Sequence, residues 1–254
     1  MSLSDAAILP PLHGSPSRDT SHGGRQALTA LAITFVVVFA GEAFGTFASD
    51  TAQHLTPDAN PIFARLAKPA IIALYQIALL WFVVGWLSGS VERPNTLGLG
   101  WPAFRWWHWI ACIGALYALK AGLSLVAVFT MQGADVTAVV TPSASPFGAL
   151  MRSPAWPLML LGGVLAAIIE ELLYRGYLSR TLEASRLGFW GGAIIASIVW
   201  AGLHAYYPLG MQAVLAVMGV ALSWLRARTG SIYPGMAWHI ANNVIALVAL
   251  KLIG

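Results

Sequence analysis

Long apolar segments recur between residues 27 and 250, most of them close to the 20 or so residues that a helix needs to cross a bilayer. Seven transmembrane helices are predicted, at 27–48, 69–89, 107–131, 157–179, 190–207, 210–225 and 231–250. Only 9% of the residues are charged and 58% are hydrophobic, so polar side chains are too few to cover a soluble fold. We therefore predict an all-α, polytopic integral membrane bundle of about seven helices.

The same composition argues against several functional classes. A cytosolic enzyme and a disordered protein both need far more polar residues, and the single cysteine, Cys112, cannot form an internal disulfide. The net charge is +4, but no run rich in Lys and Arg is present, so no nucleic-acid partner is predicted. The expected surroundings are a lipid bilayer.

Polar and proline-rich stretches divide the chain into four predicted parts. They are a flexible polar tail (1–26), a first group of transmembrane helices (27–131), a loop (132–156) and a core of four further transmembrane helices (157–250). The core holds most of the ionisable residues expected at membrane depth.

Basic residues predict the orientation. With a cytoplasmic N-terminus, that side carries Arg18, Arg25, Arg93, Arg105, Arg180, Arg186, Arg226 and Arg228, and the other side carries Arg65, Lys68, Arg152 and Lys251. Positive residues gather on the cytoplasmic side of membrane proteins, so the N-terminus is predicted to be cytoplasmic. No retention or eukaryotic targeting signal is recognised, which favours a bacterial inner membrane.

Two adjacent glutamates and an arginine lie toward the end of the fourth predicted helix. A charged side chain at the centre of a span costs about 2.5–3.5 kcal/mol, so such residues indicate function. Glu171 and Arg175 are spaced i,i+4 in the favourable order for an ion pair. The side chain of Glu170 points about 100° away from that of Glu171 and has no cation nearby in sequence. A carboxylate that is not held in an ion pair is what a general base requires.

The fifth and seventh predicted helices add two histidines and an asparagine. His204 follows Trp200 by one turn, and Asn243 follows His239 by one turn, so each pair can share a helix face. Either pair can simply join neighbouring helices by hydrogen bonds. Together with a carboxylate, however, imidazole and amide groups can activate water and hold an oxyanion.

A metal site is a second interpretation of these residues. Glu170, His204 and His239 are ligand types that suit a divalent cation such as zinc. The H-E-x-x-H helix of soluble metalloproteases is absent from the sequence. No cofactor is therefore assigned from the sequence, and a divalent metal such as zinc stays an alternative.

The three polar groups, in this order, resemble the motifs of the CPBP family, which contains type II CAAX prenyl endopeptidases and Abi-type and lysostaphin-resistance-like proteins. The motifs are Glu170-Glu171-x-x-x-Arg175, Trp200-x-x-x-His204 and His239-x-x-x-Asn243, within 157–250. The resemblance implies an intramembrane endopeptidase acting on a peptide or protein, prenylated or not. One position departs from the family pattern, because Trp200 stands where phenylalanine is usual.

The resemblance also implies a role for each residue. Glu170 activates water with help from His204, and His239 and Asn243 stabilise the oxyanion. Arg175 positions the glutamate pair, and Glu171 supports it.

Two other functions remain open at this point. A non-proteolytic scaffold or bacteriocin-immunity protein could keep the fold, and a proton- or metal-coupled transporter could use the same ionisable groups. Lys120, in the third predicted helix, and Glu42, in the first, lie outside the motifs. We predict that Lys120 faces the polar cavity or pairs with Glu42.

Overall fold

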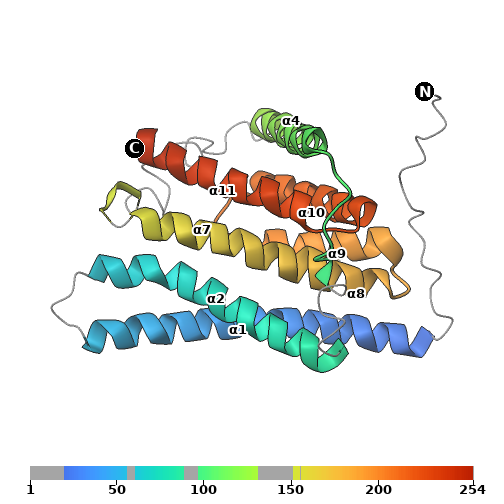
Figure 1. The fold of residues 1–254 in the computed structure, drawn as a ribbon, viewed down its shortest axis with the longest axis horizontal. Coiled ribbons are helices and arrows are strands. Elements are labelled where there is room, and N and C mark those ends of the chain that lie inside the picture. The colour runs from blue at the N-terminus through green and yellow to red at the C-terminus, as the bar shows by residue number, and fades with distance from the viewer. Residues whose placement is uncertain (1–19, 56–60, 89–96, 131–150, 155, 254) are drawn as a thin grey trace.

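The chain folds as a bundle of helices, with no strand in the part that the structure describes. A computed structural model describes residues 20–55, 61–88, 97–130, 151–154 and 156–253 (Figure 1). The helices are α1 (Thr20–Leu55), α2 (Pro61–Ser88), α4 (Trp106–Thr130), α7 (Trp156–Glu170), η2 (Glu171–Ser179), α8 (Arg180–Glu183), α9 (Gly188–Gly202), α10 (Leu209–Thr229) and α11 (Tyr233–Ile253). The predicted all-α fold is confirmed.

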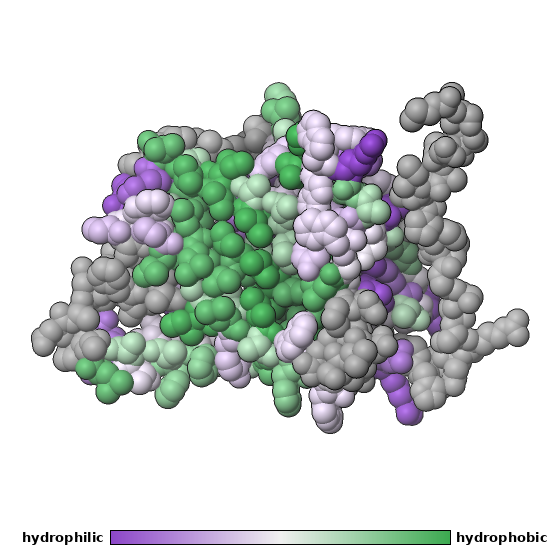
Figure 2. Space-filling model, in the orientation of Figure 1, coloured by the Kyte–Doolittle hydropathy of each residue, from purple (hydrophilic) through white to green (hydrophobic). Residues whose placement is uncertain are grey.

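Among the described residues, six helices are long and apolar enough to cross a membrane. They are α1, α2, α4, the continuous rod formed by α7, η2 and α8, and then α10 and α11. Large apolar side chains such as Phe39, Phe82 and Leu125 are exposed on their outer faces. On the face shown in Figure 2, hydrophobic residues gather in the middle and hydrophilic ones toward both ends. The protein is therefore an integral membrane protein.

The fifth predicted span, 190–207, is too long. Helix α9 has 15 residues and ends at Gly202. At a rise of 1.5 Å per residue it is about 22 Å long, short of the ~30 Å hydrocarbon core. The chain then turns before α10, and the side-chain amide of Gln212 donates to the Tyr207 carbonyl oxygen at 2.8 Å. His204 thus follows the helix instead of lying within it.

The fourth span extends further than the predicted 157–179. The rod runs without a break from Trp156 to Glu183, and its middle part, η2, is a π-helix. Glu170 is the last residue of α7, near the midpoint of the rod. The glutamates therefore lie deep in the bundle, at the start of the π-helix. Such π-helical turns are frequent at functional sites.

Packing places α7 at the centre. It lies between α2 and α11, while α1 covers the other side of α2 and α4 lies against α10 and α11 (Figure 1). One apolar core, including Val37, Leu80, Leu173 and Trp200, joins α1, α2, η2 and α9. A second core joins α4, α10 and α11 around Met218 and Trp238. The bundle thus brings the three motif-bearing segments together, namely the junction of α7 and η2, the end of α9 with the turn after it, and α11.

Several predicted boundaries fall at the edge of the described part. Helix α1 begins at Thr20, so residues 20–26 of the predicted flexible tail are helical, whereas residues 1–19 lie outside the description. Most of the predicted loop 132–156 also lies outside it. The division into parts at 27–131 and 157–250 stays a prediction, as does the cytoplasmic N-terminus.

Candidate active site

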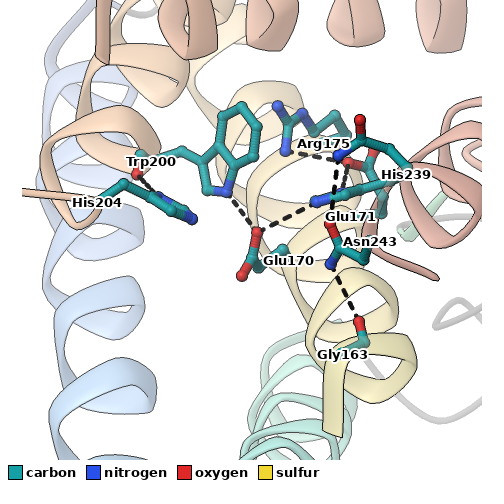
Figure 3. A network of polar contacts seen from close by, with 9 residues as sticks. Gly163, Glu170, Glu171, Arg175, Trp200, His204, His239 and Asn243 are labelled. Atoms are coloured by element: carbon teal, nitrogen blue, oxygen red, sulfur yellow. Dashed lines mark hydrogen bonds and ion pairs between the residues drawn. The ribbon is translucent and has the colours of Figure 1, made fainter. Parts of the chain in front are cut away.

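Side chains from the rod, α9 and α11 meet at the middle of the rod. Glu170 and Glu171 come from the junction of α7 and η2, Trp200 from α9, and His239 from α11 (Figure 3). His239 is 4% exposed and lies between the two glutamates. Its Nδ1 is 2.9 Å from Glu171 Oε1, and its Nε2 is 3.6 Å from Glu170 Oε2.

The predicted pair between Glu171 and Arg175 is present and fully enclosed. Nη1 of Arg175 lies 3.1 Å from Glu171 Oε1, and each side chain is 1% exposed. Nη1 and Nη2 of Arg175 make no hydrogen bond, so the contact is an ion pair. The guanidinium also lies over the Trp200 ring, 4.1 Å from its centroid. Arg175 thus contacts both the Glu171 carboxylate and the face of the Trp200 ring.

Glu170 is the more accessible of the two glutamates. Its side chain is 23% exposed, and its Oε2 accepts a hydrogen bond from the indole Nε1 of Trp200 at 2.6 Å. No ion pair with Lys or Arg holds it among the described residues. One carboxylate held by arginine and a neighbouring one open to the cavity is the arrangement that the sequence predicted.

His204 lies in the turn after α9 and faces the same region. Its Nδ1 is 2.9 Å from the carbonyl oxygen of Trp200. A carbonyl only accepts, so Nδ1 carries the proton in this contact. In the neutral ring, Nε2 is then a free acceptor that can orient a water molecule.

A cavity of about 350 Å³ opens beside Glu170. Its polar lining comes from both halves of the chain and comprises Glu42, Lys68, Gln76, Glu170, Tyr174, Trp200, His204 and Tyr206. The volume lies within the range of small-molecule binding sites in proteins. Glu170 and His204 therefore share a space large enough for water and part of a peptide.

Asn243 lies one turn beyond His239 but does not line this cavity. Its amide nitrogen donates to the carbonyl oxygen of Gly163 at 3.1 Å. The second amide hydrogen is left for another acceptor, because an asparagine side chain carries two donors. Asn243 thus belongs to the site's outer edge, between α7 and α11.

The predicted metal ligands do not converge. Glu170, His204 and His239 form no cluster suited to a metal ion, and the described residues hold no other group of three or more such ligands. Both nitrogens of His239 face glutamate oxygens. The arrangement therefore does not fit a three-ligand metal centre, and no chemical step is assigned to a metal.

One predicted contact is wrong. Lys120 donates from Nζ to Oδ1 of Asn242 in α11, on the α4 side of the bundle. Glu42 lines the cavity on the α1–α2 side. Lys120 therefore neither pairs with Glu42 nor lines the cavity, because α7 and α11 lie between the two helices that carry these residues.

Two features of the site in the structure are not predicted from the sequence. No role for the indole N–H of Trp200 is predicted from the sequence, although a buried tryptophan usually finds an acceptor. The contribution of Lys68 and Gln76 to the cavity depends on how α2 packs against α7. No spacing within α2 could have indicated that contact.

Comparison with known families agrees with the resemblance found in the motifs. Residues 152–245, less than half the chain, match the family model described as type II CAAX prenyl endopeptidase Rce1-like. This match supports a CPBP family intramembrane protease and therefore a CAAX-type peptidase in general terms. Searches of curated proteins and of solved structures found no match. Helices α1, α2 and α4 lie outside the matched segment.

Proposed function

We propose that this protein is an intramembrane endopeptidase in which Glu170 is the base that activates water. One observation carries the proposal: the Glu170 carboxylate opens into a cavity that His204 also lines, 3.6 Å from Nε2 of a second histidine, His239. A base needs access to water together with groups that fix its geometry. The donation from Trp200 supplies part of that geometry.

The proposed reaction begins with a water molecule between Glu170 and His204. Glu170 takes one proton from the water while Nε2 of His204 accepts a hydrogen bond from it. The resulting hydroxide adds to the peptide carbonyl carbon and forms a tetrahedral intermediate. The C–N bond then breaks as Glu170 returns the proton to the leaving amine.

The negative oxygen of the intermediate needs donors. His239, when protonated, can donate from Nε2, and Asn243 can donate its second amide hydrogen. The enclosed ion pair between Glu171 and Arg175 supports this proposal because it fixes Nδ1 of His239 through Glu171. We therefore assign Glu171 and Arg175 to positioning.

The substrate class follows from the surroundings of the site. The cavity lies inside a bundle of membrane helices and is partly apolar, so we propose a peptide or protein segment that enters from the bilayer. A prenyl group on the substrate would add apolar contact, and matched prenylated and unmodified peptides test that requirement. The proposed setting is a bacterial inner membrane with a cytoplasmic N-terminus.

The test compares turnover of a fluorogenic peptide library by purified wild type, Glu170→Gln and His204→Ala in detergent. Both variants should lose at least about 100-fold in kcat, as removal of a general base does. Asp50→Asn and His54→Ala are matched controls, because both residues are exposed near the end of α1, and neither lines the cavity. They should retain wild-type turnover.

Two outcomes would overturn the proposal. Equal turnover by wild type and Glu170→Gln would remove Glu170 as the base. Peptide binding without cleavage by a folded wild type would favour a non-proteolytic scaffold or immunity protein. Loss of activity on chelation, restored by zinc, would show a metal dependence that the described ligand geometry does not predict.

A further inference from the structure

Lys120 is a cation at membrane depth with a neutral partner. It lies within α4, and its Nζ donates to Oδ1 of Asn242. Helix α4 packs against α10 and α11 and lies outside the Rce1-like segment. Because an intramembrane charge is costly, a lysine kept there for one amide contact needs an explanation.

The contact continues as a chain of amides toward α7. Nδ2 of Asn242 faces Oδ1 of Asn243 at 3.5 Å. Nδ2 of Asn243 in turn donates to the Gly163 carbonyl at 3.1 Å. The chain therefore crosses the bundle from α4 through α11 to α7 and includes Asn243, a residue of the proposed site.

The direction of this chain is set at both of its ends, because the Gly163 carbonyl at the far end only accepts hydrogen bonds. An ammonium group only donates, whereas an amide side chain can present either its oxygen or its nitrogen. Lys120 therefore requires the oxygen of Asn242 and turns its nitrogen toward Asn243. That nitrogen requires the oxygen of Asn243, which leaves the Asn243 nitrogen facing Gly163 and the site.

The glycine at the far end allows the close approach that this contact needs. A Cβ on residue 163 would lie 2.7 Å from Cδ1 of Leu247, too close without a shift of that side chain. Gly163 thus lets α11 approach α7 so that Asn243 reaches the carbonyl oxygen.

We propose that Lys120 is a positioning residue that acts through Asn242, together with the Gly163 carbonyl, to fix the amide orientation of Asn243. This inference rests on the proposed function, in which Asn243 donates to the oxyanion. Lys120 contacts no substrate. It ensures that the asparagine presents N–H groups and not its oxygen to the reacting carbonyl.

The first test measures kcat and KM for Lys120→Met and Lys120→Arg. Methionine keeps the length of the chain but cannot donate, so kcat should fall about tenfold with KM nearly unchanged, less than the ~100-fold or greater loss seen when an oxyanion donor itself is removed. Arginine is also donor-only and should restore most of kcat. Lys251→Met, in the last turn of α11, is the control and should retain wild-type kcat.

A double variant separates positioning from general stability. In an Asn243→Ala background, Lys120→Met should cause no further loss of kcat, because there is no amide left to orient. An equal loss in both backgrounds would overturn the proposal. So would wild-type kcat in Lys120→Met while Glu170→Gln is inactive, an outcome that leaves the proposed function standing.

The amide chain can also be tested without turnover. The Tm decreases of Lys120→Met and Asn243→Ala should add up to more than the decrease of the double variant, although the two residues do not touch. Replacing Asn242 by leucine should abolish this coupling. Additive Tm shifts in the presence of Asn242 would overturn the inference even if no substrate is found.

Discussion

Trp200 binds both the candidate base and the candidate water-orienting histidine: its indole N–H donates to Glu170 Oε2 at 2.6 Å, and its carbonyl oxygen accepts from His204 Nδ1 at 2.9 Å. The side-chain contact depends on tryptophan, whereas any residue offers the carbonyl. The departure from the family's phenylalanine therefore adds a donor to the site.

Replacing Trp200 by phenylalanine should lower kcat about tenfold or more. A hydrogen bond to a charged group is worth about 1.5–3 kcal/mol, and each 1.4 kcal/mol is a factor of ten. Steady-state cleavage of the best library peptide measures the effect. Trp224→Phe, at a partly exposed position on α10, is the control. Unchanged or increased kcat in Trp200→Phe would show that the indole N–H is dispensable.

Glu171→Gln should destabilise the fold by about 3–5 kcal/mol, because it leaves Arg175 enclosed without its counter-charge. Thermal unfolding in detergent measures the loss. Adding Arg175→Met to Glu171→Gln should recover part of the stability, since neither charge is then unpaired. If the double variant loses the sum of the two single effects, the pair does not act as a unit.

The two histidines should respond differently to alanine. His204 lies in a turn at the cavity, so its replacement should remove turnover and leave Tm nearly unchanged. His239 is 4% exposed and joins two glutamates, so its replacement should lower both turnover and Tm. Parallel kcat and Tm measurements distinguish these cases. Similar Tm losses in both variants would contradict the assignment of His204 to the cavity alone.

Gly219→Ala should disturb the site from α10. A Cβ there would lie 2.7 Å from Ser197 Oγ and 3.0 Å from Arg175 Nη2. Such overpacking costs about 1–3 kcal/mol, and it should also displace the guanidinium from Glu171. Gly114→Ala is the matched control, because nothing lies within 4 Å of its Cβ. Equal Tm values for the two alanine variants would refute the steric argument.

The sequence predicts those parts of the site that depend on spacing within one helix. Glu171 and Arg175 are four residues apart and form the expected ion pair. The difference between an enclosed Glu171 and an accessible Glu170 also follows from the angle between adjacent residues on a helix. Local geometry is sufficient for these predictions.

Contacts between helices could not be predicted in the same way. The pairing of Lys120 with Glu42 was wrong because the packing order places α4 beside α11 and α1 beside α2. The end of α9 was also misjudged, since the apolar run continues through Leu203 although the helix stops at Gly202. Hydrophobicity alone predicts neither which helices pack against each other nor the residue at which a helix ends.

The position of Glu170 within its rod sets a requirement for any peptide that reaches it. From Trp156 to Glu170 the helix rises about 21 Å at 1.5 Å per residue, so the carboxylate lies far from the end of the rod at Trp156. A peptide crossing lipid at that depth is helical, and its carbonyl oxygens are occupied by its own amides. Hydrolysis there requires a segment that unwinds locally, so peptides containing glycine or proline near the scissile bond are the natural first choice as probes.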